Sequence, residues 1–269
     1  MKKLLTIIAV MAFCVSAAFA NSNDLWEEST LNQIMKRGEL RVGLEAGYMP
    51  FELKNKKGEI VGFDVDIAKR MAKDMGVKLN LVNTAWDGII PSLLTKKFDI
   101  IMSGMTITPQ RNLQVNFCDP YIVVGQTILI REDLKDEIKS YRDLNDPKYT
   151  VSTKLGVTAE KATKRYISKA KLRLFETEQE AVMEVVNGKA DAFVYDLPYS
   201  ASYYSENPKN LVFLDEPFTY EPLAWAIRKG DPDFMNWLNN FLAQIKGDGF
   251  YDKVYKKWFL SNSWLKDIQ

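Results

Sequence analysis

The side chains that could carry out chemistry in this chain are carboxylates, lysines, tyrosines and serines, because its 269 residues include no histidine. Ser-His-Asp and Cys-His nucleophile systems are therefore excluded, and so are the common zinc sites that contain histidine. Arg111, which follows the segment Gly104-Met105-Thr106, offers a planar guanidinium. Such a group can bind a carboxylate through two parallel hydrogen bonds, which a lysine cannot do. The sequence thus offers a group for carboxylate recognition and no histidine-based catalytic machinery.

The overall charge argues against a nucleic-acid-binding protein. Lys and Arg together number 36 and Asp and Glu 35, which gives a net charge of +1, and no run of Lys or Arg is longer than two. Nucleic-acid binding normally requires a basic excess or stripe. The hydrophobic share of 46% and the charged share of 26% are typical of a globular protein. The length allows one large domain or two lobes, each able to bury a core.

Residues 1–20 have the pattern of a cleavable secretory signal. Two lysines precede an apolar run over residues 4–15, and small residues end at Ala18-Phe19-Ala20. The run is too short to span a membrane. Lipoprotein processing before Cys14 is an alternative, but the bulky Phe that precedes this cysteine disfavours it. Cleavage after Ala20 leaves Cys118 as the only cysteine, which excludes an intramolecular disulfide.

Strand-like and helix-like segments alternate in two sets along the mature chain. In residues 63–75, apolar side chains recur every four positions, which predicts one buried helical face. The expected strands are 40–44, 77–82, 98–102, 149–151, 172–175, 192–195 and 223–228, and the expected helices are 63–75, 87–95, 159–168, 178–187 and 234–245. This alternation predicts an α/β protein with two lobes, each a mainly parallel sheet flanked by helices, and a ligand cleft between them.

Three groups of residues carry a resemblance to a known family. They are Gly62-Phe63-Asp64-Val65-Asp66-Ile67-Ala68, then Trp86-Asp87-Gly88-Ile89-Ile90-Pro91 with Phe98-Asp99-Ile100, and lastly Ser103-Gly104-Met105-Thr106-Ile107-Thr108-Pro109-Gln110-Arg111 with Phe117-Cys118-Asp119-Pro120-Tyr121. Over essentially the whole mature chain, the sequence resembles the family-3 periplasmic solute-binding proteins for amino acids. Cys118 is a departure, since the family usually has Ser there.

The resemblance implies a two-lobe periplasmic-binding-protein clamp of type II. Lobe 1 is expected to comprise residues 21–124 and 223–269, and lobe 2 residues 125–222. The chain would cross between the lobes near residues 122–125 and 223–225, where a hinge motion would close them. The resemblance further implies a monomer in the periplasm that delivers a free amino acid to an ABC permease in the inner membrane. No cofactor and no metal ion are expected.

Five candidate ligand-binding residues follow from the resemblance for the parts that every amino acid shares. Arg111 and Thr106 are expected to bind the α-carboxylate, and Thr158 to donate a backbone N–H to it from a helix start. Gly104 would accept from the ammonium group through its carbonyl, and Asp196 would supply the opposite charge for that group.

Three further residues are expected to surround the ligand side chain. Tyr48 and Trp86 occupy positions where the family packs aromatic rings, although aromatic residues are more often part of a core. Glu45 stands where receptors for basic amino acids carry an acidic residue, since a buried cationic side chain requires an opposite charge. Lysine or arginine is therefore the expected ligand. A neutral polar amino acid such as glutamine is the alternative if Glu45 faces solvent or pairs with a cation of the protein.

An enzyme on the same scaffold is the alternative function. Cyclohexadienyl dehydratases resemble these binding proteins and use a carboxylate of lobe 2 as a proton donor. Glu160 stands where such a residue would lie. A general acid requires a pKa raised by burial or by negative neighbours. A Glu at this position after Thr158 is also an ordinary capping residue, and the sequence favours that interpretation.

Overall fold

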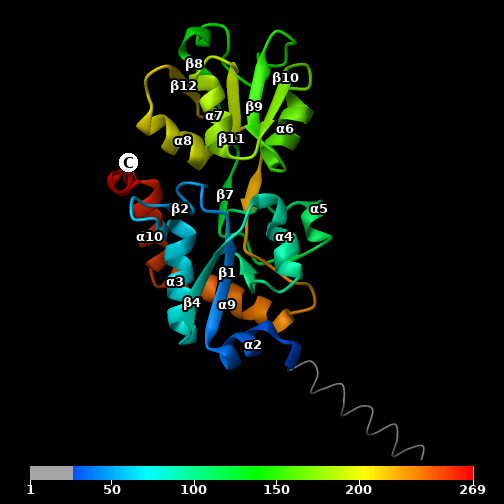
Figure 1. The fold of residues 1–269 in the computed structure, drawn as a ribbon, viewed down its shortest axis with the longest axis vertical. Coiled ribbons are helices and arrows are strands. Elements are labelled where there is room, and N and C mark those ends of the chain that lie inside the picture. The colour runs from blue at the N-terminus through cyan, green and yellow to red at the C-terminus, as the bar shows by residue number, and fades with distance from the viewer. Residues whose placement is uncertain (1–26, 269) are drawn as a thin grey trace, which may run out of the picture.

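The structure of the protein is a computed structural model that describes residues 27–268. It has two lobes, one above the other in Figure 1, called here the lower and the upper lobe. The expected signal peptide, residues 1–20, lies outside the described residues. Within the described part of the chain, no helix combines the length and the apolar character needed to cross a membrane.

The lower lobe is built on a five-stranded sheet with strand order β4-β1-β5-β14-β6. Strand β1 (Glu39–Leu44) pairs in parallel with β4 (Lys78–Asn83) and β5 (Ile100–Ile101). Strand β14 (Ala226–Ile227) pairs antiparallel with β5 and with β6 (Asn116–Phe117). The sheet is therefore mixed, with its parallel strands on one side.

Helices cover this sheet, and several of them come from the end of the chain. They are α2 (Thr30–Arg37), α3 (Phe63–Met75), α4 (Trp86–Leu94), α5 (Pro109–Asn112), α9 (Pro232–Gly247), α10 (Phe250–Phe259) and the 3-10 helix η2 (Ser263–Asp267), beside a hairpin of β2 (Leu53–Lys54) and β3 (Ile60–Val61). The period-four positions of α3, namely Phe63, Ile67, Met71 and Met75, are all buried, which confirms the expected apolar face. Helix α10 packs against α3 and α9.

The upper lobe has a second five-stranded sheet with order β10-β9-β11-β8-β12. Strand β9 (Thr150–Lys154) is parallel to β10 (Lys171–Phe175) and β11 (Ala192–Asp196), while β8 (Gln126–Arg131) is antiparallel to β11 and β12 (Leu211–Leu214). Its helices are α6 (Thr158–Tyr166), α7 (Glu178–Val186), α8 (Leu197–Glu206) and the 3-10 helix η1 (Glu132–Leu134). The predicted α/β class with two lobes is confirmed.

A two-stranded antiparallel ribbon, β7 (Ile122–Val124) with β13 (Glu221–Leu223), lies between the lobes in Figure 1. The single strand expected over residues 223–228 is wrong. Leu223 pairs with Ile122 in this ribbon, whereas Ala226 pairs with the lower sheet. Residues 223–227 form one continuous apolar run because all of them are buried. Within this run, the chain leaves the two-stranded ribbon and enters the lower sheet.

Candidate functional site

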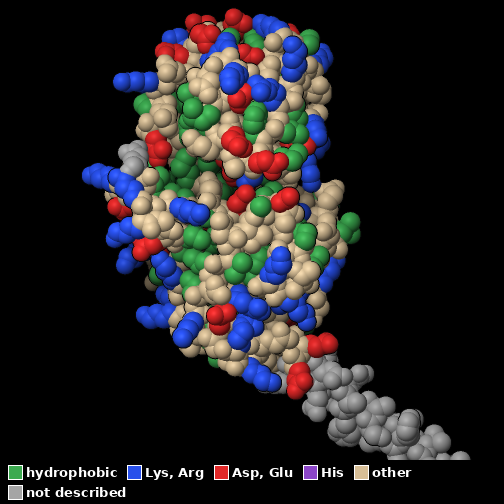
Figure 2. All heavy atoms as spheres, viewed as in Figure 1, with side chains coloured by type: hydrophobic (Ala, Val, Ile, Leu, Met, Phe, Trp, Pro, Cys, Tyr) green, Lys and Arg blue, Asp and Glu red, His purple; other side chains and the backbone are tan. Residues whose placement is uncertain are grey.

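A small pocket, with a cavity volume of about 20 Å³, lies between the lobes, and residues from both contribute to its wall. All eight predicted site residues line it: Glu45, Tyr48, Trp86, Gly104, Thr106, Arg111, Thr158 and Asp196. Five residues that the sequence did not single out line it as well: Ser103, Val157, Ala159, Glu178 and Tyr195. Figure 2 shows the waist between the lobes, with acidic side chains on both sides of it.

Both sheets direct the carboxyl ends of their parallel strands toward the pocket. Glu45 follows β1, and Ser103 and Gly104 come shortly after β5. In the upper lobe, Thr158 lies just beyond β9, and Asp196 is the last residue of β11. The carboxyl ends of parallel strands are where open α/β sheets usually bind ligands. This edge-to-edge arrangement explains why residues far apart in sequence share one pocket.

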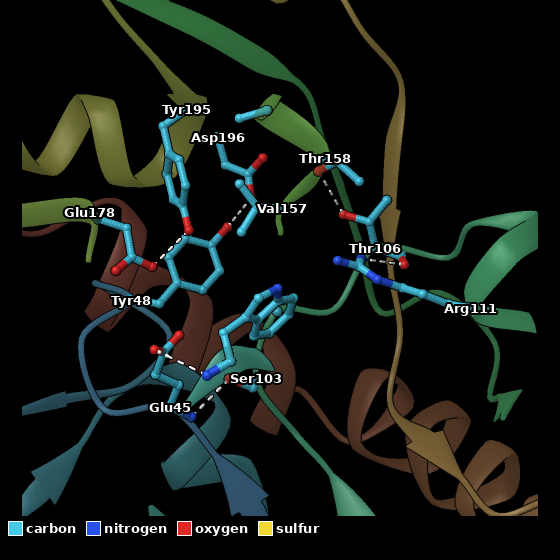
Figure 3. Close-up of a pocket in the computed structure, with 13 residues that line it drawn as sticks. Glu45, Tyr48, Ser103, Thr106, Arg111, Val157, Thr158, Glu178, Tyr195 and Asp196 are labelled. Atoms are coloured by element: carbon cyan, nitrogen blue, oxygen red, sulfur yellow. Dashed lines mark hydrogen bonds between the residues drawn. The ribbon is translucent and has the colours of Figure 1, made fainter. Parts of the chain in front are cut away.

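Arg111 is a buried cation that forms no ion pair with any described residue. Its side chain comes from α5, where the Thr108 hydroxyl accepts from the Arg111 N–H at 3.2 Å. The guanidinium Nη1 donates to the Thr106 carbonyl at 3.0 Å, and the residue is 8% exposed. No carboxylate among the described residues lies within 4.0 Å of it. Burial lowers the pKa of Arg111, partly offset by Glu221 and Asp196. In Figure 3 the group points toward Thr106 and Thr158.

The N-terminus of α6 lies opposite this arginine. Thr158 is the first residue of α6, and its Oγ1 lies 3.5 Å from Oγ1 of Thr106 in the lower lobe. Gln126 Nε2 donates to the same Thr158 oxygen at 3.3 Å. Helix N-termini attract anions through free N–H groups and the helix dipole. An anion at this end of the pocket would therefore contact Arg111 and a helix start together.

Asp196 is a buried carboxylate held by two hydrogen bonds. The Tyr48 hydroxyl donates to its Oδ2 and the Gln126 amide donates to its Oδ1. Burial raises the pKa of Asp196 to about 7 even though the bonds from Tyr48 and Gln126 favour the ionised form. Neither donor carries a charge, so a cation placed beside Asp196 would be strongly favoured.

Gly104 allows Tyr48 to reach this carboxylate. Its φ is +51°, and a Cβ at this position would lie 2.2 Å from Cε1 of Tyr48. The Gly104 N–H donates to Asp64 Oδ2 at 3.1 Å, which fixes the backbone beneath the pocket. Only glycine satisfies both the left-handed backbone and the close approach of the ring.

A cluster of three charges occupies the other end of the pocket. Lys154 Nζ forms ion pairs with Glu45 of the lower lobe and with Glu178 Oε1 at 3.0 Å. The Tyr195 hydroxyl also donates to Glu178 Oε1, at 2.7 Å. Burial raises the pKa of Glu45, opposed by Lys154 and reinforced by Glu178. Glu45 therefore does pair with a cation of the protein, yet the cluster holds two carboxylates for one ammonium group.

Lys154 and Glu178 were not predicted as site residues. Lys154 ends β9 and Glu178 begins α7 directly after β10. The strand expected over residues 149–151 ended three positions before Lys154, and Glu178 was expected only as the first residue of a helix, so neither was recognised at the edge of the pocket.

Trp86 connects the parts of the site. Its indole Nε1 donates to the Gly156 carbonyl of the upper lobe at 3.2 Å, and its backbone N–H donates to Glu45 Oε1 at 3.3 Å. The centroid of its ring lies 5.1 Å from Cζ of Arg111 and 5.8 Å from Nζ of Lys154, and both are cation–π distances.

Glu160, the candidate general acid, is not among the residues that line the pocket. It accepts from the Gly156 N–H at 2.7 Å and pairs with Lys164. Burial alone would raise the pKa of Glu160, but these two contacts outweigh it and the pKa is lowered. An ionised carboxylate held in this way has no proton to donate, which is the reverse of what a general acid requires.

Solved structures with the same fold bind amino acids. A proposed binding component of an ABC transporter from Wolinella succinogenes DSM 1740, complexed with lysine, is 60% identical with a TM-score of 0.84, covering 86% of this chain and 99% of its own. The ancestral amino acid-binding protein AncCDT-1, a precursor of cyclohexadienyl dehydratase, is 56% identical with a TM-score of 0.82, covering 86% of this chain and 100% of its own.

Sequence comparison points in the same direction. The L-cystine-binding protein TcyJ of Escherichia coli K12 is 28% identical over 253 residues, which are 94% of each chain. The model of the bacterial extracellular solute-binding proteins, family 3, matches residues 40–261. The resemblance drawn from the sequence is thereby confirmed, and this chain belongs to the bacterial extracellular solute-binding proteins of family 3.

Proposed function

We propose that this protein binds a free L-amino acid with a cationic side chain, lysine or arginine, and delivers it to the permease of an ABC importer. It acts as a periplasmic monomer after removal of residues 1–20. Residues 21–124 with 223–269 form one lobe and residues 125–222 the other, and the lobes close around the ligand. Family membership and the amino-acid-binding neighbours support this assignment.

The end of the pocket near the ribbon fits the α-carboxylate and the α-ammonium group. Arg111 is buried without a carboxylate within 4.0 Å among the described residues, so an anion there removes an unfavourable isolated charge. Thr106 and the first turn of α6 at Thr158 add neutral donors. Asp196 offers the opposite charge for the ammonium group, and Gly104 offers its backbone carbonyl.

The observation that carries the choice of ligand is the charge at the other end. Glu45 and Glu178 are both partly or fully buried, and Lys154 balances only one of them. One negative charge is thus left at the place where the ligand side chain would lie. A lysine or arginine side chain supplies the missing positive charge, and Trp86 and Tyr48 flank its aliphatic part.

A neutral ligand would leave that charge unbalanced. Glutamine could satisfy Arg111 and Asp196 equally well, but its amide brings only partial charges to Glu45. The neighbour that is 60% identical contains lysine, which supports the cationic choice.

Calorimetric titration of the refolded, ligand-free protein tests the proposal. Lysine, arginine, histidine, glutamine, glutamate and cystine are compared, and lysine or arginine should bind at least about 100-fold more tightly than glutamine. Glu45→Gln should reduce lysine binding by about tenfold or more, whereas the matched control Glu132→Gln, on an exposed side chain of the upper lobe, should not. Tighter binding of glutamine, glutamate or cystine would overturn the assignment. Incubation with prephenate should yield no aromatic product.

A further inference from the structure

Lys154 is a lysine enclosed by protein at the side-chain end of the pocket. Its side chain is 1% exposed, and Glu178 of the same lobe and Glu45 of the other lobe lie on either side of it. It is not itself among the residues that line the pocket. Its charge therefore acts on the pocket from within the wall, through the two carboxylates that do line it.

We propose that Lys154 is a specificity-determining residue that sets the net charge of the cluster Glu45, Glu178 and Lys154 at −1 and so selects ligands whose side chain carries one positive charge. This rests on the proposed function and deepens it. The protein cation and the ligand cation share two carboxylates. Specificity then depends on the sum of the charges and not on Glu45 alone.

The other groups around the cluster leave this sum unchanged. The Tyr195 hydroxyl and the Trp86 ring contact the cluster and are neutral. Glu52 lies nearby, but burial and then Asp64 raise the pKa of Glu52 well above its usual range, which favours its neutral form. Burial opposes the charge of Lys154, yet Glu178 and Glu45 outweigh burial and raise its pKa. The ammonium group is therefore charged at neutral pH.

The Lys154–Glu45 pair also joins the two lobes, which decides how the inference must be tested. Any change in this pair alters the free energy of closing the lobes for every ligand. Closure is common to lysine and glutamine, so it cancels in the ratio of their dissociation constants. The preference for lysine over glutamine is thus the readout, and absolute affinity is not.

Restoring the charge sum provides the test. Glu178→Gln makes the cluster neutral and should lower the preference for lysine over glutamine by about tenfold or more. Adding Lys154→Gln returns the sum to −1 through Glu45 alone, and the double variant should recover the wild-type preference within about threefold. Lys154→Gln alone would leave two buried carboxylates without a positive charge, which destabilises the fold, so the double variant is used. Lys154→Arg keeps the charge and should keep the preference.

The outcomes separate this inference from the proposed function. Thermal melts first establish that each variant is folded. If the wild type binds no cationic amino acid, the proposed function fails. If the wild type prefers lysine but the double variant keeps the lowered preference of Glu178→Gln, Lys154 is a structural residue and the inference is wrong. Recovery in the double variant supports it, because a purely structural lysine could not restore selectivity by being removed.

Discussion

The hydroxyl of Tyr48 in the lower lobe donates a hydrogen bond to Oδ2 of Asp196 in the upper lobe. Both residues are buried, with exposed fractions of 5% and 7%. The bond satisfies an oxygen of the carboxylate but brings no positive charge to it. Both side chains that donate to Asp196, those of Tyr48 and Gln126, are neutral. The ionised form of this carboxylate is therefore unfavourable until a cation binds beside it.

Asp196→Asn is expected to stabilise the ligand-free protein at pH 8. The pKa of Asp196 is about 7 in the folded protein, against about 3.9 for an unfolded chain. The folded state therefore binds more protons between these values, and the free energy of unfolding falls as the pH rises through them. Removing the carboxylate should recover about 2–4 kcal/mol at pH 8 and little at pH 4. Thermal melts at both pH values measure this.

The same variant should lose amino-acid binding, because an amide cannot balance the α-ammonium group. Calorimetry on Asp196→Asn checks the loss. A variant that is less stable at pH 8, or that binds lysine as wild type does, would contradict the role given to this carboxylate.

Ligand affinity should rise with pH. A bound ammonium group favours the ionised form of Asp196, so binding below its pKa of about 7 requires loss of a proton. The raised pKa of Glu45 acts in the same direction. The dissociation constant should fall by up to about tenfold per pH unit between pH 5 and 7 and level off near pH 8. A constant affinity from pH 5 to 8 would show that neither carboxylate titrates on binding.

Arg111→Ala should abolish binding and leave the fold intact. The side chain forms no ion pair with a described residue, so its removal breaks the hydrogen bond to the Thr106 carbonyl and the cation–π contact with the Trp86 ring. The loss of binding should be on the order of 3–5 kcal/mol, as for removal of one partner of a buried charge pair. Arg111→Lys should restore little of it, since an ammonium group lacks the planar fork. Arg142→Ala, at an exposed arginine, is the control, and calorimetry with circular dichroism provides the comparison.

Gly104→Ala should damage the pocket more than an equivalent change elsewhere. The new Cβ would approach Tyr48 Cε1 to 2.2 Å at a φ of +51°. Gly188→Ala is the matched control, because Gly188 has a φ of +69° and no atom within 4 Å of the added Cβ. Both variants carry the cost of a left-handed alanine, about 1 kcal/mol. Only Gly104→Ala should also weaken lysine binding, since it displaces Tyr48 from Asp196. Equal effects of the two variants would mean that the contact with Tyr48 is unimportant.

The spacing of apolar residues predicted helices and strands well where one face of the helix or strand is buried. Helix α3 is an example, since its period-four positions all face the core. The same reasoning joined residues 223–228 into one strand, because burial continues while the hydrogen-bond partners change. Periodicity reports which side chains are buried and not which strand lies beside them.

The eight candidate residues were identified through the resemblance to a known family, whereas the charge cluster was not identified from the sequence. Lys154 meets Glu45 across 109 positions of sequence and Glu178 across 24. A lysine at a strand end is ordinarily exposed. Its burial depends on two partners that only the folded arrangement brings together, so no local signal identified it.

The ribbon of β7 and β13 lies beside one end of the pocket. Thr106 forms an isolated β-bridge with Leu223, and the Leu197 N–H donates to the Gly125 carbonyl at 2.9 Å, beside Asp196. Among the described residues, no hydrogen bond joins Glu45 or Lys154 to the ribbon. When one lobe rotates about this ribbon, an atom moves further the greater its distance from the ribbon. Thr106 and Asp196, which lie at or beside the ribbon, would then move little, and the contact between Glu45 and Lys154 would separate further. A spectroscopic label at that contact would thus report the angle between the lobes more sensitively than a label beside the ribbon.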